Sequence, residues 1–303
     1  MSVDLKGLTK RFGEQYAVNN ISFTVNKGQI VGFLGPNGAG KSTTMKMLTC
    51  YTEPTSGSAT VNGYDIKTQP LEVRKSVGYL PEHNPLYKDM YVKEYLGFVA
   101  GIHRVSKPKK RIEDLIEMTG LGLEQHKLIG ALSKGYRQRV GLAQAMMHDP
   151  EVLILDEPTS GLDPNQLRDI RSLILELGKQ KTVIFSTHIM QEVSALCDRV
   201  LIVNRGDLVA DDPIDTLQAR VHSELQLEVQ FDSAISEEKL GQIKGLKSFK
   251  KDNGKYVILA SEDIRKEIFH WTVAQNVALL EMNSIKLSIE NVFTELTQSE
   301  QNV

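Results

Sequence analysis

Residues Gly35-Pro36-Asn37-Gly38-Ala39-Gly40-Lys41-Ser42-Thr43 fit the phosphate-loop pattern G-x-x-x-x-G-K-[ST]. The apolar run at 29–34 before the loop predicts a buried strand, and residues 41–49 after it predict a helix. A strand, a glycine loop and a helix in this order are the context that the pattern requires. The sequence therefore predicts a site for nucleotide phosphates in an α/β fold; the alternative is a glycine turn with a chance lysine.

Each residue type in this loop has a chemical reason to be there. We expect Gly35, Gly38 and Gly40 to permit the backbone torsions that bring successive N–H groups towards the β-phosphate. The N-terminus of the following helix adds a favourable dipole. Lys41 can reach the β- and γ-phosphates, and the Ser42 hydroxyl can ligate Mg²⁺.

An apolar strand that ends in two acids supplies the second half of the predicted site. Residues 152–155 are Val-Leu-Ile-Leu, and Asp156 and Glu157 follow them. Ligands of open parallel sheets bind at the carboxyl ends of the strands. We expect Asp156 to hold Mg²⁺ and Glu157 to polarise an attacking water. The alternative is a strand that merely ends in solvated acids.

The rest of the first 220 residues alternates between strand and helix patterns. Strands are predicted at 151–155 and 181–186, and apolar residues at helical spacing predict a helix at 164–178 between them. Strand-helix-strand order with apolar strands indicates a parallel sheet covered on both faces. Residues 84–150 lack strand-like runs and predict a helical insertion, for example a helix at 109–119.

Composition limits the classes of protein that remain. The 303 residues suggest two domains, at about 150 residues each. The net charge of -2 argues against a nucleic-acid partner, and no apolar run approaches the ~18 residues of a membrane span. Cys50 and Cys197 fit no metal spacing and are expected to be buried thiols. The start of the chain lacks a signal-peptide pattern, so we expect a reducing, cytoplasmic setting.

Residues 221–303 have a different pattern and predict a small α+β accessory domain. Alternation at 225–231 and the run at 256–260 predict strands. Ile264, Ile268 and Trp271 recur at helical spacing, and we expect Trp271 to pack in a core rather than to bind a ligand. Ser288 is expected to cap a last helix.

Motifs between and after these elements resemble those of ATP-binding-cassette (ABC) ATPases over roughly residues 1–215. The signature motif corresponds to Leu132-Ser133-Lys134-Gly135-Tyr136-Arg137-Gln138-Arg139, the D-loop to Ser160-Gly161-Leu162-Asp163, the switch-histidine loop to Ser186-Thr187-His188, the Q-loop to Tyr79-Leu80-Pro81-Glu82, and the adenine-stacking aromatic to Phe12. The resemblance implies a P-loop NTPase (RecA-like) core at 1–220, with an antiparallel β subdomain and the helical insertion.

The resemblance also implies roles for these residues. Ser133 and Gly135, with Tyr136 in the same motif, would contact the γ-phosphate held by a second subunit. His188 would contact the γ-phosphate and orient water. Phe12 would stack on the adenine ring. Ser42, Glu82 and Asp156 would ligate Mg²⁺, and Ser160 and Asp163 would lie at the subunit interface.

Three positions depart from the family pattern. Lys134 stands where the signature has a glycine, and Tyr136 stands where it has a glutamine. Ser133 and Gly135 are retained, so the implied phosphate contacts stay intact. Glu82 replaces the Q-loop glutamine. A carboxylate still ligates Mg²⁺, but it adds negative charge beside the γ-phosphate. This charge is expected to weaken ATP binding or to change the rate of ATP hydrolysis.

The sequence Gly-Tyr-Leu-Pro-Glu at 78–82 and the tail at 288–293 resemble those of bacterial cassettes that pair with ABC-2-type export permeases. The whole chain looks most like the ATP-binding subunit of the gliding-motility ABC transporters of Bacteroidetes. This implies a homodimer, or a heterodimer with a related cassette, that binds two ATP. It also implies a separate membrane permease docked near 83–105, and a peripheral location on the cytoplasmic face of the inner membrane. The alternatives are a soluble ABC ATPase outside transport and a regulatory nucleotide-binding module.

Overall fold

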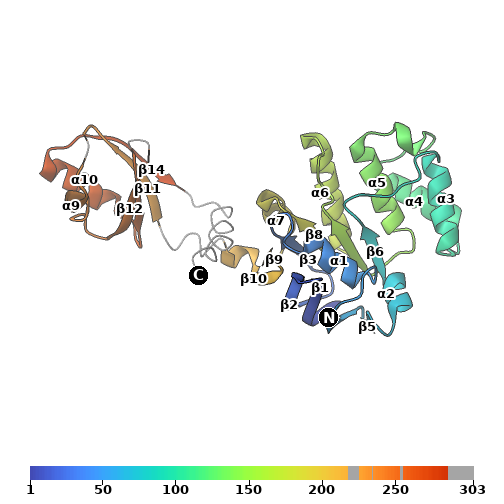
Figure 1. Cartoon of the computed structure of the whole chain (residues 1–303). Helices are drawn as coiled ribbons and strands as arrows, with labels where there is room; N and C mark the ends of the chain where they lie inside the picture. Colours follow the sequence, from blue (N-terminus) through green and yellow to red (C-terminus); the bar gives the residue numbers. More distant parts are fainter. Residues whose placement is uncertain (218–224, 234, 253–254, 286–303) are drawn as a thin grey trace. The chain divides into compact units, whose positions relative to one another are not determined.

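The computed structural model describes residues 1–217, 225–233, 235–252 and 255–285. The chain forms two compact units, Met1–Ile214 and Asp215–Val303 (Figure 1). The boundary expected at residue 220 lies outside the described residues. Within the first unit, hydrogen bonding continues to Ile214, whose N–H donates to the Asp198 carbonyl at 3.2 Å.

A six-stranded sheet organises the first unit, and its strand order is β10-β9-β3-β8-β7-β6. The strands are β3 (Ile30–Leu34), β6 (Val77–Leu80), β7 (Val152–Asp156), β8 (Thr182–Thr187), β9 (Arg199–Asn204) and β10 (Asp207–Pro213). All are parallel except β10, which pairs antiparallel with β9. Every residue of β3, β7 and β8 is buried, as the uninterrupted apolar runs predict. In register, Leu34 lies opposite Thr187 and Asp156 opposite Ser186, so the carboxyl ends of three strands meet at one edge.

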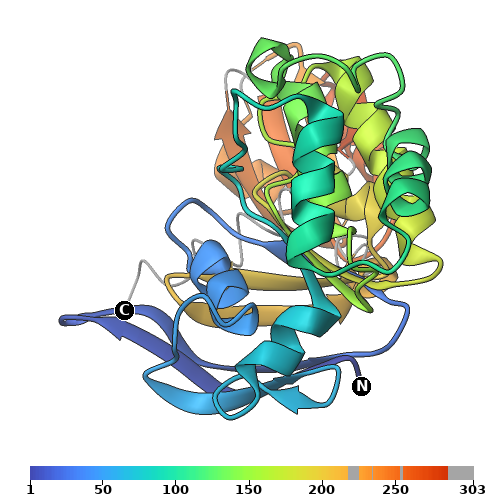
Figure 2. The ribbon, with the colours of Figure 1, turned by 90° about the vertical axis from the view of Figure 1, so that its right-hand side faces the viewer.

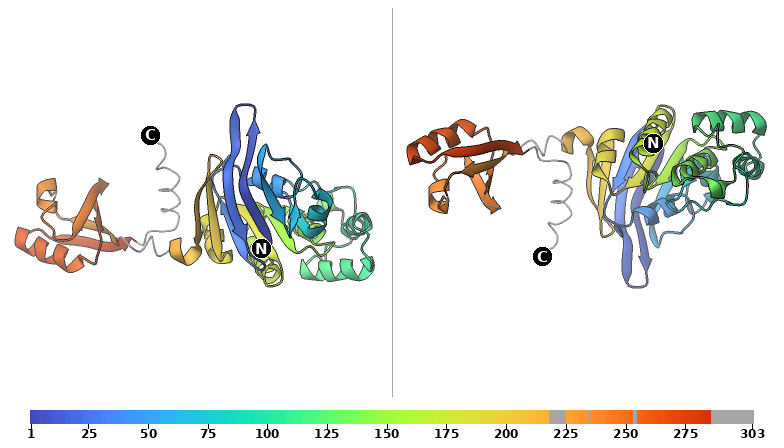
Figure 3. Two further views of the ribbon diagram at one scale, coloured as in Figure 1. Left: turned by 90° about the horizontal axis from the view of Figure 1, so that it is seen from below. Right: turned by 90° about the horizontal axis from the view of Figure 1, so that it is seen from above.

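A second, antiparallel sheet belongs to the same unit, as the resemblance implied. Its order is β2-β1-β4-β5, and Figure 3 shows the long β1–β2 hairpin. The strands are β1 (Val3–Phe12), β2 (Gln15–Val25), β4 (Ser56–Val61) and β5 (Tyr64–Asp65). Helices α1 (Lys41–Leu48), α6 (Pro164–Gly178) and α7 (Met190–Leu196) follow β3, β7 and β8 along the chain.

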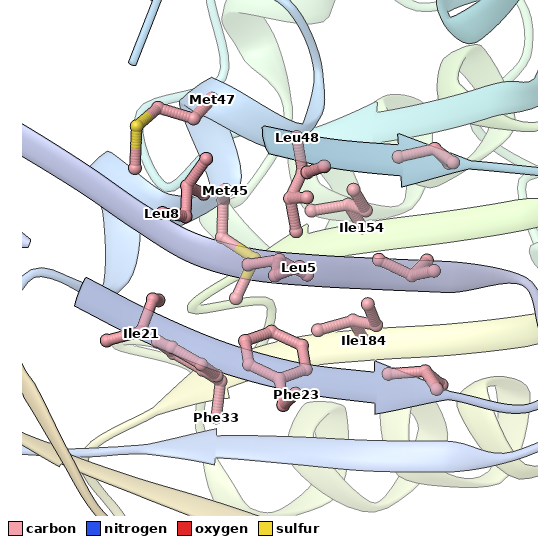
Figure 4. Close-up of a cluster of buried hydrophobic side chains, with 14 of the residues drawn as sticks. Leu5, Leu8, Ile21, Phe23, Phe33, Met45, Met47, Leu48, Ile154 and Ile184 are labelled. Carbon is pink, nitrogen blue, oxygen red and sulfur yellow. The ribbon is translucent and has the colours of Figure 1, made fainter. Parts of the chain in front are cut away.

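One hydrophobic core joins the two sheets through α1, and Figure 4 shows its side chains. Its members come from β1 and β2, from α1, and from β3, β7 and β8, and include Leu5, Leu8, Ile21, Phe23, Phe33, Met45, Met47, Leu48, Ile154 and Ile184. Burying each of these side chains contributes about 1.5–3 kcal/mol. The helix that starts at the phosphate loop is therefore fixed between the sheets.

Helices dominate the segment between β6 and β7. They are α3 (Val92–Ile102), α4 (Pro108–Met118), the 3₁₀ turn η1 (Ile129–Ala131) and α5 (Lys134–Ala145), whereas α2 (Pro70–Ser76) precedes β6. Figure 2 and Figure 1 show α3, α4 and α5 side by side at one end of the unit. The pattern at 109–119 thus predicted α4 to within a residue at each end.

His148 joins this helical part to the parallel sheet. Its ring stacks on that of His103, with centroids 4.2 Å apart and planes 6° from parallel. Nε2 lies 3.0 Å from the Val77 carbonyl at the start of β6, and since a carbonyl only accepts, Nε2 is the donor. Burial, assisted by the charge of His103, lowers the pKa of His148 to about 4.

This lowered pKa predicts an acid-sensitive first unit. The ordinary pKa of histidine is 6.5, so the neutral ring stabilises the fold fully above pH 6.5, and that stabilisation is lost as the pH falls towards 4. We expect His148 to account for about 2 kcal/mol of this loss, since the ring is partly exposed and water screens its charge. Urea unfolding at pH 7 and pH 4 should show a smaller loss in His148→Gln, while the exposed His126→Gln control should behave as wild type. Equal losses in His148→Gln and wild type would contradict the assignment.

The second unit is a four-stranded antiparallel sheet of order β12-β13-β11-β14 with two helices. Its elements are β11 (Leu225–Phe231), α9 (Glu237–Leu240), β12 (Leu246–Asp252), β13 (Lys255–Ala260), α10 (Arg265–Gln275) and β14 (Leu279–Ile285). Trp271 is 8% exposed and packs 5.8 Å from the Phe231 ring, as expected of a core residue. The helix expected after Ser288 lies outside the described residues. Across both units, none of the described helices has the length and apolar character of a membrane span.

Candidate functional site

The phosphate loop connects β3 to α1 and depends on glycine at two left-handed positions. Gly38 has φ 82° and Gly40 has φ 102°, where side chains are rarely tolerated. A Cβ on Gly40 would also lie 2.2 Å from the Ala17 carbonyl oxygen of β2. The torsions expected at these two glycines are therefore present.

The torsional reason expected for Gly35 is wrong. Gly35 is not in the left-handed region; glycine is needed because a Cβ there would lie 2.4 Å from the Val203 carbonyl oxygen of β9. Its N–H donates to the Thr187 carbonyl at 3.3 Å. Gly35 thus packs the start of the loop against β8 and β9.

Lys41 is held at the base of the loop. Its side chain is 6% exposed, and Nζ donates to the carbonyl oxygens of Gly35 at 2.8 Å and Pro36 at 3.2 Å. Nζ also lies 3.5 Å from Glu157 Oε1. A buried ammonium group can donate hydrogen bonds in several directions, so Lys41 is suited to bind the oxygens of a phosphate group held by this loop.

Ser186 of β8 links the two acids at the end of β7. Its hydroxyl donates to Asp156 Oδ1 at 2.5 Å and accepts from the Glu157 N–H at 3.0 Å. Glu157 has φ 49°, and its N–H lies within reach of the Ser186 carbonyl as well, at 3.2 Å. The role of Ser186 was not predicted from the sequence, where the available signal is a hydroxyl residue directly before Thr187 and His188.

Glu157 and His188 meet across the ends of β7 and β8. Nδ1 of His188 lies 2.9 Å from Glu157 Oε2, while the His188 side chain remains 44% exposed. Burial raises the pKa of Glu157, and the neighbouring Lys41 and His188 charges oppose that rise. A carboxyl group with a raised pKa is a better proton acceptor near neutral pH than an ordinary glutamate.

A cavity of about 510 Å³ opens over these groups. Twelve of the residues singled out from the sequence line it: Phe12, Asn37, Gly38, Ala39, Gly40, Lys41, Ser42, Thr43, Glu82, Glu157, Ser160 and His188. Gln15 and Ala17 of β2 also line it and were not predicted. Phe12 is 56% exposed at the end of β1, and Lys10 Nζ lies 5.0 Å from the centroid of its ring. An exposed aromatic ring at this edge of the cavity is suited to stacking on a planar group.

A second cavity of about 470 Å³ contains the three residues expected at a metal ion: Ser42, Glu82 and Asp156. They offer a hydroxyl and two carboxyl groups, which are the oxygen ligands that Mg²⁺ prefers. No group of three or more His, Cys, Asp or Glu side chains placed to hold a metal occurs within the described parts of the chain. This donor set therefore fits a Mg²⁺ ion that takes its remaining ligands from water and phosphate.

The signature and D-loop residues are not brought to either cavity, apart from Ser160. Ser133 caps α5, and its hydroxyl accepts from the Tyr136 N–H and from Gln166 Nε2, both at 3.4 Å. Asp163 caps α6 by accepting from two backbone N–H groups at 3.0 Å. A single chain therefore assembles the phosphate loop, the acids and His188, and leaves Ser133, Gly135 and Tyr136 elsewhere.

Lys134 lies against the D-loop. A Cβ on Gly161, which has φ 67°, would lie 2.3 Å from Lys134 Nζ. A Cβ on Gly135 would lie 2.4 Å from the Gln166 side chain. The replacement of glycine by Lys134 is thus accommodated because Gly161 leaves room for the ammonium group.

Comparisons of the sequence and of the structure with known proteins both find ATP-binding proteins of ABC transporters. The sequence model of the ABC transporter family matches residues 18–160. The ABC transporter ATP-binding protein NatA of Bacillus subtilis is 39% identical over 231 residues, covering 73% of this chain and 94% of NatA. The bacitracin transport ATP-binding protein BcrA of Bacillus licheniformis is 38% identical over 227 residues, covering 73% of each chain. A solved ATP-binding subunit of an ABC transporter superposes with TM-score 0.66 at 28% identity, covering 73% of this chain and 94% of that one.

Proposed function

Because the chain belongs to the family of ABC transporter ATP-binding proteins, which hydrolyse ATP, we propose that two copies bind and hydrolyse ATP to drive a separate export permease. The observation that supports this proposal most directly is the division of the site. The phosphate loop, Glu157 and His188 share one cavity, while Ser133 and Gly135 lie outside it. Such a site needs a second chain for completion.

The proposed reaction uses the geometry of the larger cavity. Phe12 stacks on the adenine ring, and the loop N–H groups with Lys41 Nζ bind the β- and γ-phosphates. Water attacks the γ-phosphorus, the bond to the β,γ-bridging oxygen breaks, and ADP leaves. Glu157 accepts the proton of the attacking water, while His188 holds Glu157 and contacts the γ-phosphate.

Ser42, Asp156 and Glu82 are proposed to hold Mg²⁺, which when bound neutralises the charge on the phosphates. Ser186 fixes Asp156 for this task by its hydrogen bond. The additional negative charge of Glu82 lies at the border of both cavities.

Ser133, Gly135 and Tyr136 of one copy are proposed to complete the ATP site of the second copy. These residues lie at the N-terminus of α5, with Ser133 as its N-cap, where the helix dipole favours an anion. Asp163 and Ser160 would lie at the same interface. The homodimer, or a heterodimer with a related cassette, then contains two ATP sites related by symmetry.

An exposed apolar ridge supports a membrane permease as the partner. We call Tyr87, Phe98 and Ile102 the α3 ridge; they are 55%, 44% and 62% exposed, and the first two rings lie 5.6 Å apart. Exposed apolar groups at one face indicate an interaction surface. The ridge falls inside 83–105, where the resemblance places the permease. The transport names of NatA and BcrA support transport.

We propose a peripheral location on the cytoplasmic face of the inner membrane and, among exporters, a gliding-motility transporter.

Co-purification tests whether a membrane permease is the partner. The tagged chain is purified from detergent-solubilised membranes of the organism that produces it. We expect an integral membrane permease, identified by mass spectrometry, at a fixed ratio. Ile102→Glu should lose the permease and keep the ATPase rate of the isolated chain, whereas Leu123→Glu, at a position 90% exposed, should keep both. Co-sedimentation with ribosomes, or no membrane partner, would contradict the proposal. Loss of gliding on gene disruption tests the narrower assignment.

A further inference from the structure

A fully buried carboxyl group lies four residues after His188 and has no part in the reaction proposed for the site. Glu192 belongs to α7 and is 0% exposed. It shares the buried face of this helix with the apolar residues Met190, Val193 and Leu196. An acid at such a position costs stability unless its oxygens are bound. Its partners therefore indicate what it does.

Thr187 is the principal partner of Glu192. The Thr187 hydroxyl donates to Glu192 Oε2 at 2.6 Å, and the same hydroxyl accepts from the Ile189 N–H at 3.0 Å. The residues on both sides of His188 are thus held by one hydroxyl group. The Thr187 carbonyl also accepts from the Gly35 N–H at the start of the phosphate loop. The backbone that carries the His188 ring is fixed from three directions.

Arg171 of α6 carries a positive charge close to Oε1, the second carboxylate oxygen of Glu192. Its Nη2 lies 3.9 Å from Glu192 Oε1. Oε1 and Arg171 Nε are both buried, and neither makes a hydrogen bond with any described residue. The ion pair is therefore incompletely hydrogen-bonded, and removing the Glu192 carboxylate would also leave Arg171 and the Thr187 hydroxyl without this partner.

We propose that Glu192 is a positioning residue that holds His188 against Glu157 through the Thr187 hydroxyl, with Arg171 as its counter-charge. This inference rests on the proposed function of His188 and Glu157. The distance to be held is the 2.9 Å between His188 Nδ1 and Glu157 Oε2. A shift of about 1 Å in a catalytic group lowers a rate by up to about 10²-fold, so a small loosening of this turn affects hydrolysis strongly.

The experiment changes the Thr187 hydroxyl and leaves the volume of the side chain unchanged. We expect Thr187→Val to lower kcat for ATP by about 10-fold to 10²-fold, with KM and the Kd for a fluorescent ATP analogue within about twofold of wild type. Thr187→Ser, which keeps the hydroxyl, should restore most of the rate. Glu192→Gln, which keeps an acceptor oxygen, should lose less than Glu192→Leu. Ser194→Ala removes a hydroxyl from the same helix that donates only to the Met190 carbonyl, and it should keep the wild-type kcat.

A double variant separates positioning from a general structural role. In the His188→Ala background, Thr187→Val should cause no further loss of kcat, because the hydroxyl acts through His188. The same fold-loss in both backgrounds would overturn the inference, as would a wild-type kcat in Thr187→Val. Thermal unfolding of each variant confirms that it is folded.

The two proposals fail in different ways. If His188→Ala hydrolyses ATP at the wild-type rate, the role proposed for His188 fails and this inference fails with it. If His188→Ala is slow while Thr187→Val and Glu192→Leu are unaffected, only the positioning role of Glu192 is overturned.

Discussion

Glu157→Gln is expected to lower kcat for ATP hydrolysis by about 10²–10⁴-fold while ATP still binds. The amide keeps the shape of the side chain, and its oxygen can still face His188 Nδ1, which lies 2.9 Å from Oε2. It cannot accept the proton of the attacking water. The groups that bind phosphate, including Lys41 and the loop N–H groups, are unchanged. The loss should therefore appear in the chemical step rather than in ATP affinity.

Three measurements test this expectation. Single-turnover phosphate release gives the rate of the chemical step, and a fluorescent ATP analogue gives the affinity. Gel filtration with ATP should show a dimer that persists in Glu157→Gln, because closure on ATP is no longer reversed by hydrolysis. Glu151→Gln is the matched control, since that carboxyl group is 52% exposed at the start of the same strand segment. Normal hydrolysis by Glu157→Gln would remove Glu157 from the role of general base.

Local patterns in the sequence predicted the central elements of the fold because these elements are defined by local chemistry. The apolar runs before Gly35 and Asp156 have to be strands buried on both faces, and the structure confirms β3 and β7. The helix predicted at 164–178 matches α6 in its limits, since Asp163 caps it and Pro164 begins it. Elements whose limits are set by their own apolar runs or capping residues need no information about their partners.

Pairing between distant segments could not be predicted in the same way. β1 and β4 pair across most of the first 61 residues, since Val3 lies opposite Val61 and Thr9 opposite Ser56. Their mixed buried and exposed positions do not alternate regularly. The same limit applies in the site. Ser186 is important because the register places it opposite Asp156. Glu192 is important because its side chain, near the start of α7, accepts a hydrogen bond from the Thr187 hydroxyl at the end of β8. Neither relation follows from residue type alone.

Lys41→Ala is expected to weaken ATP binding by about 10²-fold or more. The ammonium group provides charge-assisted hydrogen bonds to phosphate, each contributing about 1.5–3 kcal/mol. Its present partners, the Gly35 and Pro36 carbonyls and Glu157, lie at the mouth where the phosphates are proposed to bind. Titration with a fluorescent ATP analogue measures the loss. Lys27→Ala, at a lysine side chain that is 74% exposed, should bind ATP as wild type does. Retained ATP affinity in Lys41→Ala would refute the assignment.

The same variant tests whether a site is shared between chains. Lys41→Ala destroys the phosphate loop but keeps the signature, and Ser133→Glu places a negative charge in the signature but keeps the phosphate loop. Neither variant alone should hydrolyse ATP. In a mixture, each mixed dimer contains one site made from the intact loop of one chain and the intact signature of the other, so activity should return. The structure favours this outcome, because Ser133 and Lys41 lie in different places on one chain and only Lys41 lines the cavity. If each chain completed its own site, the mixture would stay inactive.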